Sequence, residues 1–381
     1  MIYLDYAASC VPFAEAAELS CRLSMSHYAS PGAIHSSGDR ARNVLNESRK
    51  ALAQLLQVRD REVFFTSGGT EANNWAVKLG CRQGRGRTIL VGAAEHKSVL
   101  DAAYAMEKEG FRVKLLPSDP AGHISPAALE AALTGDVCLV CIQAVNNETG
   151  AMQDVEAISR ITRSARVPFL CDAVQAFGHV ALPLHRADLI TLSAHKFGGL
   201  RGVGCLAVRY PYTLAPLLHG GGQELGLRSG TENVPGIAAM AYAARRALEE
   251  LPAEQERLAG LSGKLLDGLR EMEPRLQVNG ESGHPGILNC RFPGIRAEAL
   301  TAKLSVKGIC VSPGAACAAR DPKPSHVLLA MGYSADRASQ SIRFSLGRNT
   351  TEEEIDQTLA AVGEVLGVES GVLSVELGVR G

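Results

Sequence analysis

The sequence predicts an α/β protein with two domains, the larger built on a mostly parallel seven-stranded sheet and the smaller also α/β. Between about residues 60 and 210, short apolar runs alternate with helical patterns, which is typical of a parallel sheet covered on both faces. Polar residues stand where several runs end, as expected for an open sheet that binds its ligand there. The chain has 381 residues, 46% of them hydrophobic, which is enough for a large core and two domains.

The expected elements follow in chain order. Strands of the large sheet are expected at 62–66, 88–93, 111–116, 137–143, 167–171, 188–193 and 203–208, with helical patterns between them, for example at 97–109 and 155–164. The three glycines at 220–222 are expected in a loop that crosses a dimer interface. Two helices, at about 236–250 and 253–272, then lead to shorter units. These are strands near 276–279, 287–292, 309–311 and 341–345, and helices after Arg296, Lys323 and Thr350.

Composition and charge argue against several classes of function. The formal net charge of −1 gives no bulk attraction to nucleic acid or to an anionic membrane. No apolar run reaches the roughly eighteen residues of a spanning helix, and the strand-like start at 1–5 differs from a signal peptide. The ten cysteines are scattered, several of them inside apolar runs. We therefore expect reduced, buried thiols in a cytoplasmic protein.

One cysteine pair has the spacing of a metal or redox motif. Cys138 and Cys141 form a C-x-x-C. Their segment is nevertheless expected to be a strand, in which positions three apart point to opposite faces. No second C-x-x-C accompanies them, so we expect no metal site.

Two motifs suit a phosphorylated aldehyde cofactor. Lys196 follows the run at 188–193, and an amine held at a strand end can be partly desolvated, which favours the neutral form that makes a Schiff base. Gly69 and Thr70 lie in a glycine turn before a helical segment, where free N–H groups and the helix dipole suit a phosphate. Taken singly, a solvated lysine and an ordinary helix cap would explain these residues.

Two further strand ends supply complementary groups. Asp172 follows the run at 167–171, and a carboxylate there can keep a pyridine nitrogen protonated. His96 stands in the same position after 88–93. Alone, Asp172 could be a helix cap and His96 a structural histidine. Phosphate cradle, carboxylate, imidazole and lysine on one rim together favour pyridoxal phosphate.

Ordered motifs along almost the whole chain resemble those of one enzyme family. They are YLDYAA at 3–8, IHSSG at 34–38, FTSGGTE at 65–71, EHKSVL at 95–100, NNETG at 146–150, DAVQ at 172–175, SAHK at 193–196, GGGQELGLRSGTEN at 220–233, GAAC at 314–317, SHVL at 325–328 and IRFSLG at 342–347. In these motifs the chain resembles the cysteine desulfurases, the NifS/IscS-like branch of the class V aminotransferases with the type I pyridoxal-phosphate fold. The resemblance implies a homodimer with pyridoxal 5′-phosphate. It also adds the N-terminal segment to the small domain, so the domains are predicted at 15–250 and at 1–14 with 251–381.

The resemblance implies roles around the cofactor. Lys196 would form the Schiff base and then transfer protons, while Asp172 holds the ring nitrogen. Gln175 would contact the ring hydroxyl, and His96 would stack on the ring as an acid–base group. The implied phosphate ligands are Gly69, Thr70, Ser193 and His195, with Thr231 reaching the phosphate from the partner subunit.

Arg343 is the candidate for the substrate carboxylate, because a planar guanidinium matches a carboxylate in two parallel hydrogen bonds. Its segment alternates, so Arg343 should face opposite to Ile342 and Phe344. A salt-bridged surface arginine is the alternative. Asn147 is expected to help hold the same carboxylate.

Cys317 determines which reaction is expected. It lies among small residues and prolines at 311–324, expected to form a mobile loop, and an exposed thiol near Arg320 reaches the thiolate form more readily than a buried one. The resemblance implies that this thiolate takes the sulfur of L-cysteine as a persulfide and releases L-alanine. An acceptor protein would then receive the sulfur, for iron–sulfur cluster assembly, tRNA thiolation or other thio-cofactor synthesis.

The chain departs from the family pattern at two places, and two other functions stay open. Pro313 and several alanines stand where the loop is usually serine-rich, and Tyr6, Ser9 and Cys10 replace the common asparagine and threonines. A selenocysteine lyase, or another class V aminotransferase or lyase, would not need Cys317. A non-catalytic scaffold would keep only the fold, against which the complete set of Lys196, Asp172 and Arg343 argues.

Overall fold

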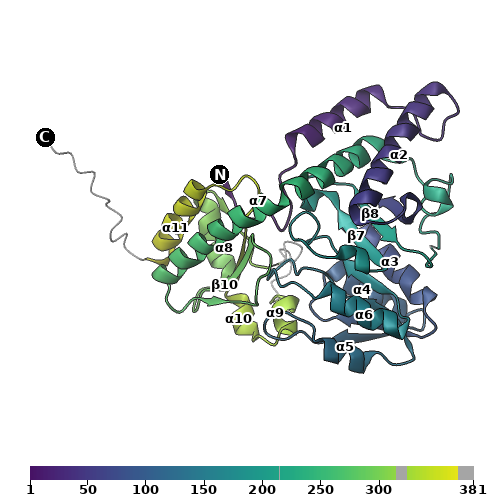
Figure 1. The fold of residues 1–381 in the computed structure, drawn as a ribbon. Helices are drawn as coiled ribbons and strands as arrows, with labels where there is room; N and C mark the ends of the chain where they lie inside the picture. The colour runs from purple at the N-terminus through teal and green to yellow at the C-terminus, as the bar shows by residue number, and fades with distance from the viewer. Residues whose placement is uncertain (214, 315–323, 368–381) are drawn as a thin grey trace.

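The computed structural model describes residues 1–213, 215–314 and 324–367, and Figure 1 shows it as a ribbon. Its larger part is built on a seven-stranded sheet with the order β2-β8-β7-β6-β5-β3-β4. Only β8 runs antiparallel to its neighbours; the other pairs are parallel. The strands are β2 (Val63–Thr66), β3 (Thr88–Gly92), β4 (Arg112–Leu116), β5 (Val137–Cys141), β6 (Phe169–Asp172), β7 (Leu189–Ser193) and β8 (Gly204–Val208). The predicted sheet is confirmed, with every strand within about two residues of its expected bounds.

Helices cover both faces of this sheet. On one face lie α3 (Gly69–Gln83) and α4 (Lys97–Glu107). On the other lie α1 (Ala14–Ser26), α2 (Ser36–Leu56), α5 (Pro126–Ala132), α6 (Val155–Ala165) and the first half of α7. Neighbouring strand residues serve opposite layers: Leu139 packs under α3, while Val140 belongs to the other core. Because both faces are buried, the central strands are continuous apolar runs, which explains why their positions could be read from the sequence; the edge strand β4 is largely exposed and carries two basic residues.

The smaller part combines the two ends of the chain. Its antiparallel sheet contains β9 (Gln277–Val278), β10 (Ile287–Arg291) and β12 (Ser341–Ser345), and β1 (Ile2–Tyr3) pairs in parallel with β11 (Ile309–Cys310). The helices α8 (Ala297–Val306) and α11 (Glu352–Leu366) complete its core. Two short helices, α9 (His326–Ala330) and α10 (Ala335–Ser339), lie toward the large sheet in Figure 1. The domain bounds at 14/15 and 250/251 stay a prediction.

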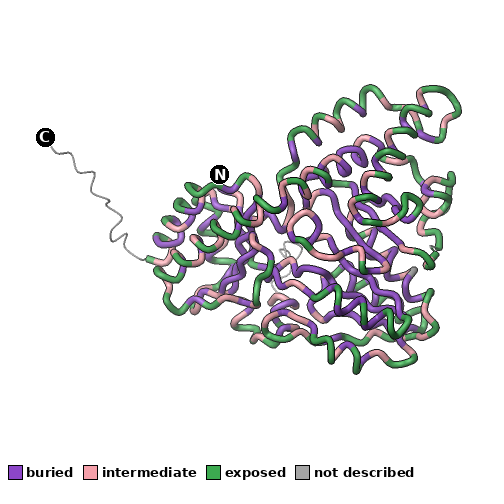
Figure 2. Tube along the Cα trace, in the orientation of Figure 1, coloured by how far each residue is buried: buried purple, intermediate pink, exposed green. Residues whose placement is uncertain are grey.

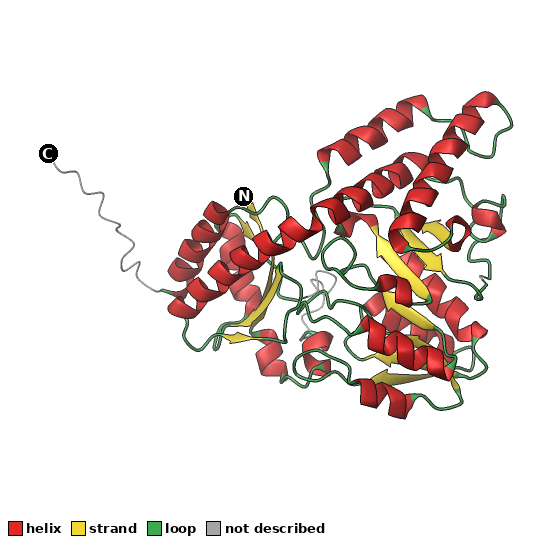
Figure 3. Cartoon of the chain, in the orientation of Figure 1, coloured by secondary structure: helices red, strands yellow, loops and turns green. Residues whose placement is uncertain are grey.

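One expectation about the helices was wrong. Instead of two helices, a single α7 (Val234–Met272) runs through Pro252 and spans both parts of the molecule, as Figure 3 shows. Its first half packs into the core of the large sheet, and Leu258 and Leu265 in its second half pack into the small one. Proline removes one N–H and crowds the preceding turn, but these buried contacts on both sides keep the helix continuous.

The burial pattern in Figure 2 separates the two cores clearly, with buried segments in each part and exposed helix faces around them. Within the described residues, no helix has the length and apolar character that crossing a membrane requires.

Candidate active site

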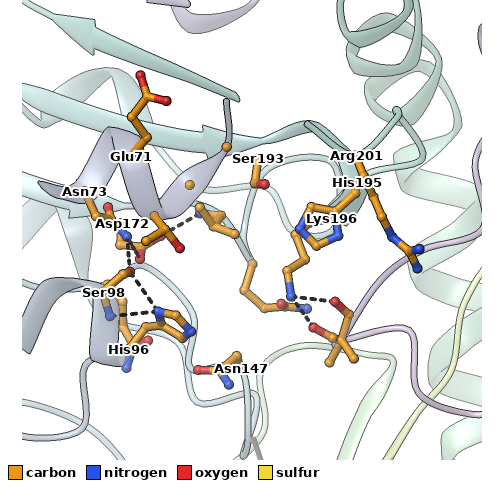
Figure 4. Close-up of a pocket in the computed structure, with 18 of the residues that line it drawn as sticks. Glu71, Asn73, His96, Ser98, Asn147, Asp172, Ser193, His195, Lys196 and Arg201 are labelled. Carbon is orange, nitrogen blue, oxygen red and sulfur yellow. Dashed lines mark hydrogen bonds between the residues drawn. The ribbon is translucent and has the colours of Figure 1, made fainter. Parts of the chain in front are cut away.

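A cavity of about 410 Å³ lies where the strands of the large sheet end (Figure 4). Most of the predicted site residues line it together: Gly69, Thr70, His96, Asn147, Asp172, Gln175, Ser193, His195, Lys196 and Arg343. Thr231 is exposed and does not line the cavity of this chain. Cys317 falls outside the described residues.

Lys196 is held at the end of β7 by contacts from the N-terminal segment. Its Nζ donates to the carbonyl oxygens of Ala7 at 2.6 Å and Ala8 at 3.1 Å. Its own carbonyl oxygen accepts from Cys10 Sγ at 2.6 Å and lies 2.7 Å from His179 Nε2. Cys10 and His179 therefore fix the backbone of Lys196. Its amine is directed to the cavity wall formed by residues 7 and 8.

A hydrogen-bonded chain connects Asp172 to His96. Asn73 Nδ2 donates to Asp172 Oδ2 at 2.7 Å and to Ser98 Oγ at 2.9 Å, while Thr191 Oγ1 donates to Asn73 Oδ1 at 2.6 Å. Ser98 Oγ lies 2.7 Å from His96 Nδ1. Asn73 is thus the shared partner that fixes the carboxylate and, through Ser98, the imidazole.

The imidazole of His96 is held in one tautomer. Its Nδ1 caps α4 by accepting from Ser98 N at 3.1 Å, which leaves the ring proton of the neutral form on Nε2. Burial lowers the pKa of His96, and the nearby Asp172 partly opposes that shift. A neutral His96 that carries its proton on Nε2 can stack on a cofactor ring and donate that proton.

The glycine turn predicted to bind phosphate lies at the N-terminus of α3, on the cavity. Gly69 begins the helix, so free N–H groups of its first turn point away from the helix body. A Cβ atom at Gly69 would lie 2.9 Å from Val174 Cγ2 and 3.3 Å from Ser193 Cβ, so this turn requires glycine. Burial, with Lys196 and Arg201, lowers the pKa of His195 to about 4, and its Nδ1 lies 3.1 Å from Ser9 Oγ.

These residues fit pyridoxal phosphate. Gln175 Oε1 is buried in the cavity wall and has no hydrogen-bond partner among the described residues. A ring hydroxyl would supply the missing donor. The cradle at Gly69 and Thr70 suits the phosphate, and Asp172 suits a ring nitrogen. An amine at Lys196 on the same cavity completes the set.

Arg343 faces the cavity, as the alternation in β12 predicts, whereas Ile342 and Phe344 pack into the small core. It is not the salt-bridged surface arginine of the alternative reading, because its side chain is 1% exposed. Nη2 donates to Asp5 Oδ1 at 2.6 Å and Nη1 donates to the Asn147 carbonyl at 2.7 Å. Asn147 therefore contacts Arg343 through its backbone.

Several residues of the cavity were not predicted. Asn73 and Ser98 carry the chain from Asp172 to His96, and Arg201 brings a further cation to the rim. One signal existed for Asn73: it stands three residues after Thr70, so both lie on the same face of α3. Nothing in the sequence singles out Ser98 or Arg201.

The C-x-x-C lies inside β5, as expected, but the two thiols do not face opposite layers: Cys138 and Cys141 both belong to the core beneath α3 and α4, because the pairing of β5 with β3 shifts register after Val137. Burial raises the pKa of Cys138 to about 12 and that of Cys141 well above its usual value. Across the described part of the chain, no group of three or more His, Cys, Asp or Glu side chains is arranged to hold a metal ion.

Comparison with known proteins gives the chain its relatives. The family model "Aminotransferase class-V" matches residues 2–358. "Cysteine desulfurase IscS" of Anaeromyxobacter sp. (strain Fw109-5) is 44% identical over 338 residues, which cover 87% of this chain and 83% of the relative. The protein of the same name from Clostridium botulinum is 36% identical over 373 residues, covering 96% and 94%. A solved "NIFS-LIKE PROTEIN" superposes with a TM-score of 0.90 at 36% identity, covering 96% of this chain and 99% of that structure.

Proposed function

Because the chain belongs to the class-V aminotransferase family, we propose that it is a pyridoxal-phosphate-dependent cysteine desulfurase, which converts L-cysteine to L-alanine and takes the sulfur as a persulfide on Cys317. Its relatives named cysteine desulfurase support this activity. The single observation that carries the proposal is the meeting of Lys196, Asp172 and Arg343 in one cavity. A scaffold protein would have no need to bury an arginine and a carboxylate beside a lysine amine.

The chain's own residues bind, orient and move protons. Pyridoxal phosphate, when bound, supplies an electron sink for negative charge at the Cα of an amino acid. Asp172 favours that sink by its negative charge, and its Oδ2 is oriented by Asn73. The fork of Arg343 binds the substrate carboxylate, and the Lys196 amine moves the Cα proton. His96, neutral and carrying its proton on Nε2, donates that proton at the cofactor ring.

The sulfur step is the one that the resemblance to cysteine desulfurases implies for Cys317. Its thiolate attacks the sulfur of the bound cysteine; the new S–S bond forms as the Cβ–S bond of the substrate breaks. The electron pair of that broken bond stays with the substrate, and Cβ takes up a proton to become the methyl group of L-alanine. The persulfide then passes to the thiol of an acceptor protein, for iron–sulfur cluster assembly or another thiolation.

We also propose that two copies form the working enzyme in the cytoplasm. Thr231 is exposed in the single chain, so it is available to reach the phosphate of the partner's cavity. The cysteines that the structure describes are all free, which suits a reducing compartment. Replacing Thr231 by valine should weaken cofactor retention in both cavities, and unchanged pyridoxal occupancy would count against the shared site.

The decisive experiment measures alanine formed from L-cysteine with excess thiol reductant, for wild type and Cys317→Ala. We expect alanine from wild type and almost none from the variant. Equal alanine from both would remove Cys317 from the chemistry and favour a lyase of the selenocysteine type. If wild-type protein holds pyridoxal phosphate but forms no alanine, then either the substrate is not cysteine or turnover requires an additional partner.

A further inference from the structure

The two ends of the segment that carries Cys317 meet at one buried carboxylate. The chain enters residues 315–323 at Gly314 and leaves them at Pro324 and Ser325. Ser325 Oγ lies 2.5 Å from Glu148 Oε2. A Cβ atom at Gly314 would lie 3.4 Å from the same Oε2 and 3.9 Å from Ser325 Cβ. The entry and the exit of the segment therefore lie close together beside the Glu148 carboxylate, which accepts a hydrogen bond from Ser325 at the exit.

The entry is fixed to the substrate-binding strand. Ser312 and Arg343 exchange two backbone hydrogen bonds, at 2.8 and 3.2 Å, so residue 312 is attached to the residue proposed to hold the substrate carboxylate. The Ser312 hydroxyl then donates to the Gly314 carbonyl at 2.6 Å, which turns the chain toward Glu148.

The exit is fixed to the large domain. Ser325 Oγ accepts from Leu328 N at 3.2 Å as the cap of α9, so its own hydrogen is available for Glu148. His326 Nε2 lies 2.9 Å from the carbonyl oxygen of Glu95, the residue before His96. Behind these contacts, Val327 and Leu328 pack with Ala94.

Glu148 itself is held rigidly. It is 1% exposed, its N–H donates to Asn146 Oδ1 at 2.9 Å, and its carbonyl accepts from Asn289 Nδ2 at 3.0 Å. It follows Asn147, whose carbonyl binds Arg343. A buried carboxylate is costly unless it is hydrogen-bonded, so the Ser325 contact is one that the fold has reason to keep.

We propose that Glu148 is a positioning residue: through Ser325 it holds together the two ends of the Cys317 segment, beside the groups that bind the substrate carboxylate. This inference rests on the proposed function in so far as Cys317 takes the sulfur. Glu148 does not act on the substrate. Its effect is to hold Ser325, at the exit of that segment, near Gly314 at the entry, which Ser312 attaches to Arg343.

The test compares two serine caps in the holoenzyme. Ser325→Ala removes a cap and the contact with Glu148, whereas Ser334→Ala removes the equivalent cap of α10, in which Ser334 Oγ accepts from Arg337 N at 3.1 Å. We expect Ser325→Ala to lower kcat for alanine formation roughly tenfold, the size of one lost hydrogen bond to a carboxylate. The affinity for L-alanine, measured by titrating the cofactor absorbance, should stay the same. Ser334→Ala should change neither value.

A second pair of variants distinguishes the hydrogen-bond acceptor of Glu148 from the volume of its side chain. Glu148→Gln keeps an oxygen that can accept from Ser325 and should retain most of the activity, whereas Glu148→Leu should lose as much as Ser325→Ala. A glutamine variant as impaired as the leucine variant would overturn the inference, as would weaker binding of L-alanine in Ser325→Ala.

Labelling of Cys317 by iodoacetamide, followed by mass spectrometry of its peptide, gives a readout that needs no turnover. Release of one end should raise the labelling rate in Ser325→Ala several-fold over Ser334→Ala. Equal rates would overturn the inference, even if wild type forms alanine. A raised rate in a protein whose wild type forms no alanine would keep the positioning role and reject the proposed function.

Discussion

Asp5 Oδ1 accepts a hydrogen bond of 2.6 Å from Nη2 of Arg343, although the two residues stand 338 positions apart in the chain. The contact joins the N-terminal segment to β12, and Ser345 pairs with Asp5 through the backbone as well. With the Asn147 carbonyl on Nη1, the guanidinium is held from two sides. Its buried Nε has no hydrogen-bond partner among the described residues, so N–H groups remain for a substrate carboxylate.

This contact predicts that Asp5→Asn impairs substrate binding more than the chemical step. Asparagine keeps an acceptor for Nη2 but loses the charge, so the fork should be less firmly oriented. We expect the KM for L-cysteine to rise roughly three- to tenfold while kcat changes little. Arg343→Lys, which has no fork, should raise KM by roughly a hundredfold. Unchanged KM in Arg343→Lys would show that another group binds the carboxylate.

We expect Asn73 to be important for activity, although it was not predicted as a site residue. Asn73→Ala removes the donor to both Asp172 and Ser98, so the ring-nitrogen carboxylate and the His96 ring lose a common support. We expect kcat/KM to fall at least roughly tenfold and the pH dependence of the cofactor absorbance to shift. The matched control is Asn74→Ala, because Asn74 donates to the Thr70 carbonyl on α3 and not to Asp172. Equal loss in both variants would contradict the network.

The large sheet could be predicted because each strand leaves its own signal in a short stretch of sequence. Strands buried on both faces, such as β5, leave continuous apolar runs, and parallel connectivity places their polar ends on one rim. Asp172, Lys196 and His96 were predicted for that reason, and the three residues line one cavity. The single helix α7 was wrongly predicted as two helices, because the contacts that keep it continuous through Pro252 come from two separate cores and leave no local signal.

The missed parts of the site depend on distant partners. The pairing of Asp5 with Arg343, and the position of Ser98 between Asn73 and His96, arise only when separate elements meet. The carbonyls of Ala7 and Ala8 at Lys196 carry no side-chain signal at all. Cys317 and Arg320 lie outside the described residues, so what the sequence indicates for them stays a prediction.

The phosphate cradle should not tolerate a side chain at Gly69. Gly69→Ala places a methyl group against Val174 and Ser193, so the turn must shift and the free N–H groups with it. We expect pyridoxal phosphate to be lost on dialysis at least roughly tenfold faster than from wild type. In Gly260→Ala the added Cβ meets nothing within 4 Å, and α7 should become more stable by about 1 kcal/mol. Equal cofactor retention in Gly69→Ala and Gly260→Ala would rule out the cradle.

The stability of the fold should decrease with acid because of a buried histidine pair. The rings of His179 and His284 lie with centroids 5.1 Å apart and planes tilted by 43°, and burial lowers the pKa of both. His284 Nδ1 accepts from Gly286 N at 3.0 Å, and its buried Nε2 has no partner among the described residues. Protonation of His284 would therefore place a charge on a buried ring whose Nε2 has no acceptor among the described residues, whereas His179 Nε2 contacts the Lys196 carbonyl.

The direction of the pH effect follows from proton binding. Below about pH 6.5 the two histidines bind protons in the unfolded chain but not in the folded protein. The free energy of unfolding therefore falls as pH drops from about 6.5 toward the lowered folded-state pKa values. Each histidine contributes a slope of up to about 1.4 kcal/mol per pH unit in that window. His284→Gln should flatten the decrease in melting temperature between about pH 7.5 and about pH 5.5, whereas His219→Gln, at an exposed histidine, should leave it unchanged. Parallel pH profiles for wild type and His284→Gln would assign the acid sensitivity to other groups.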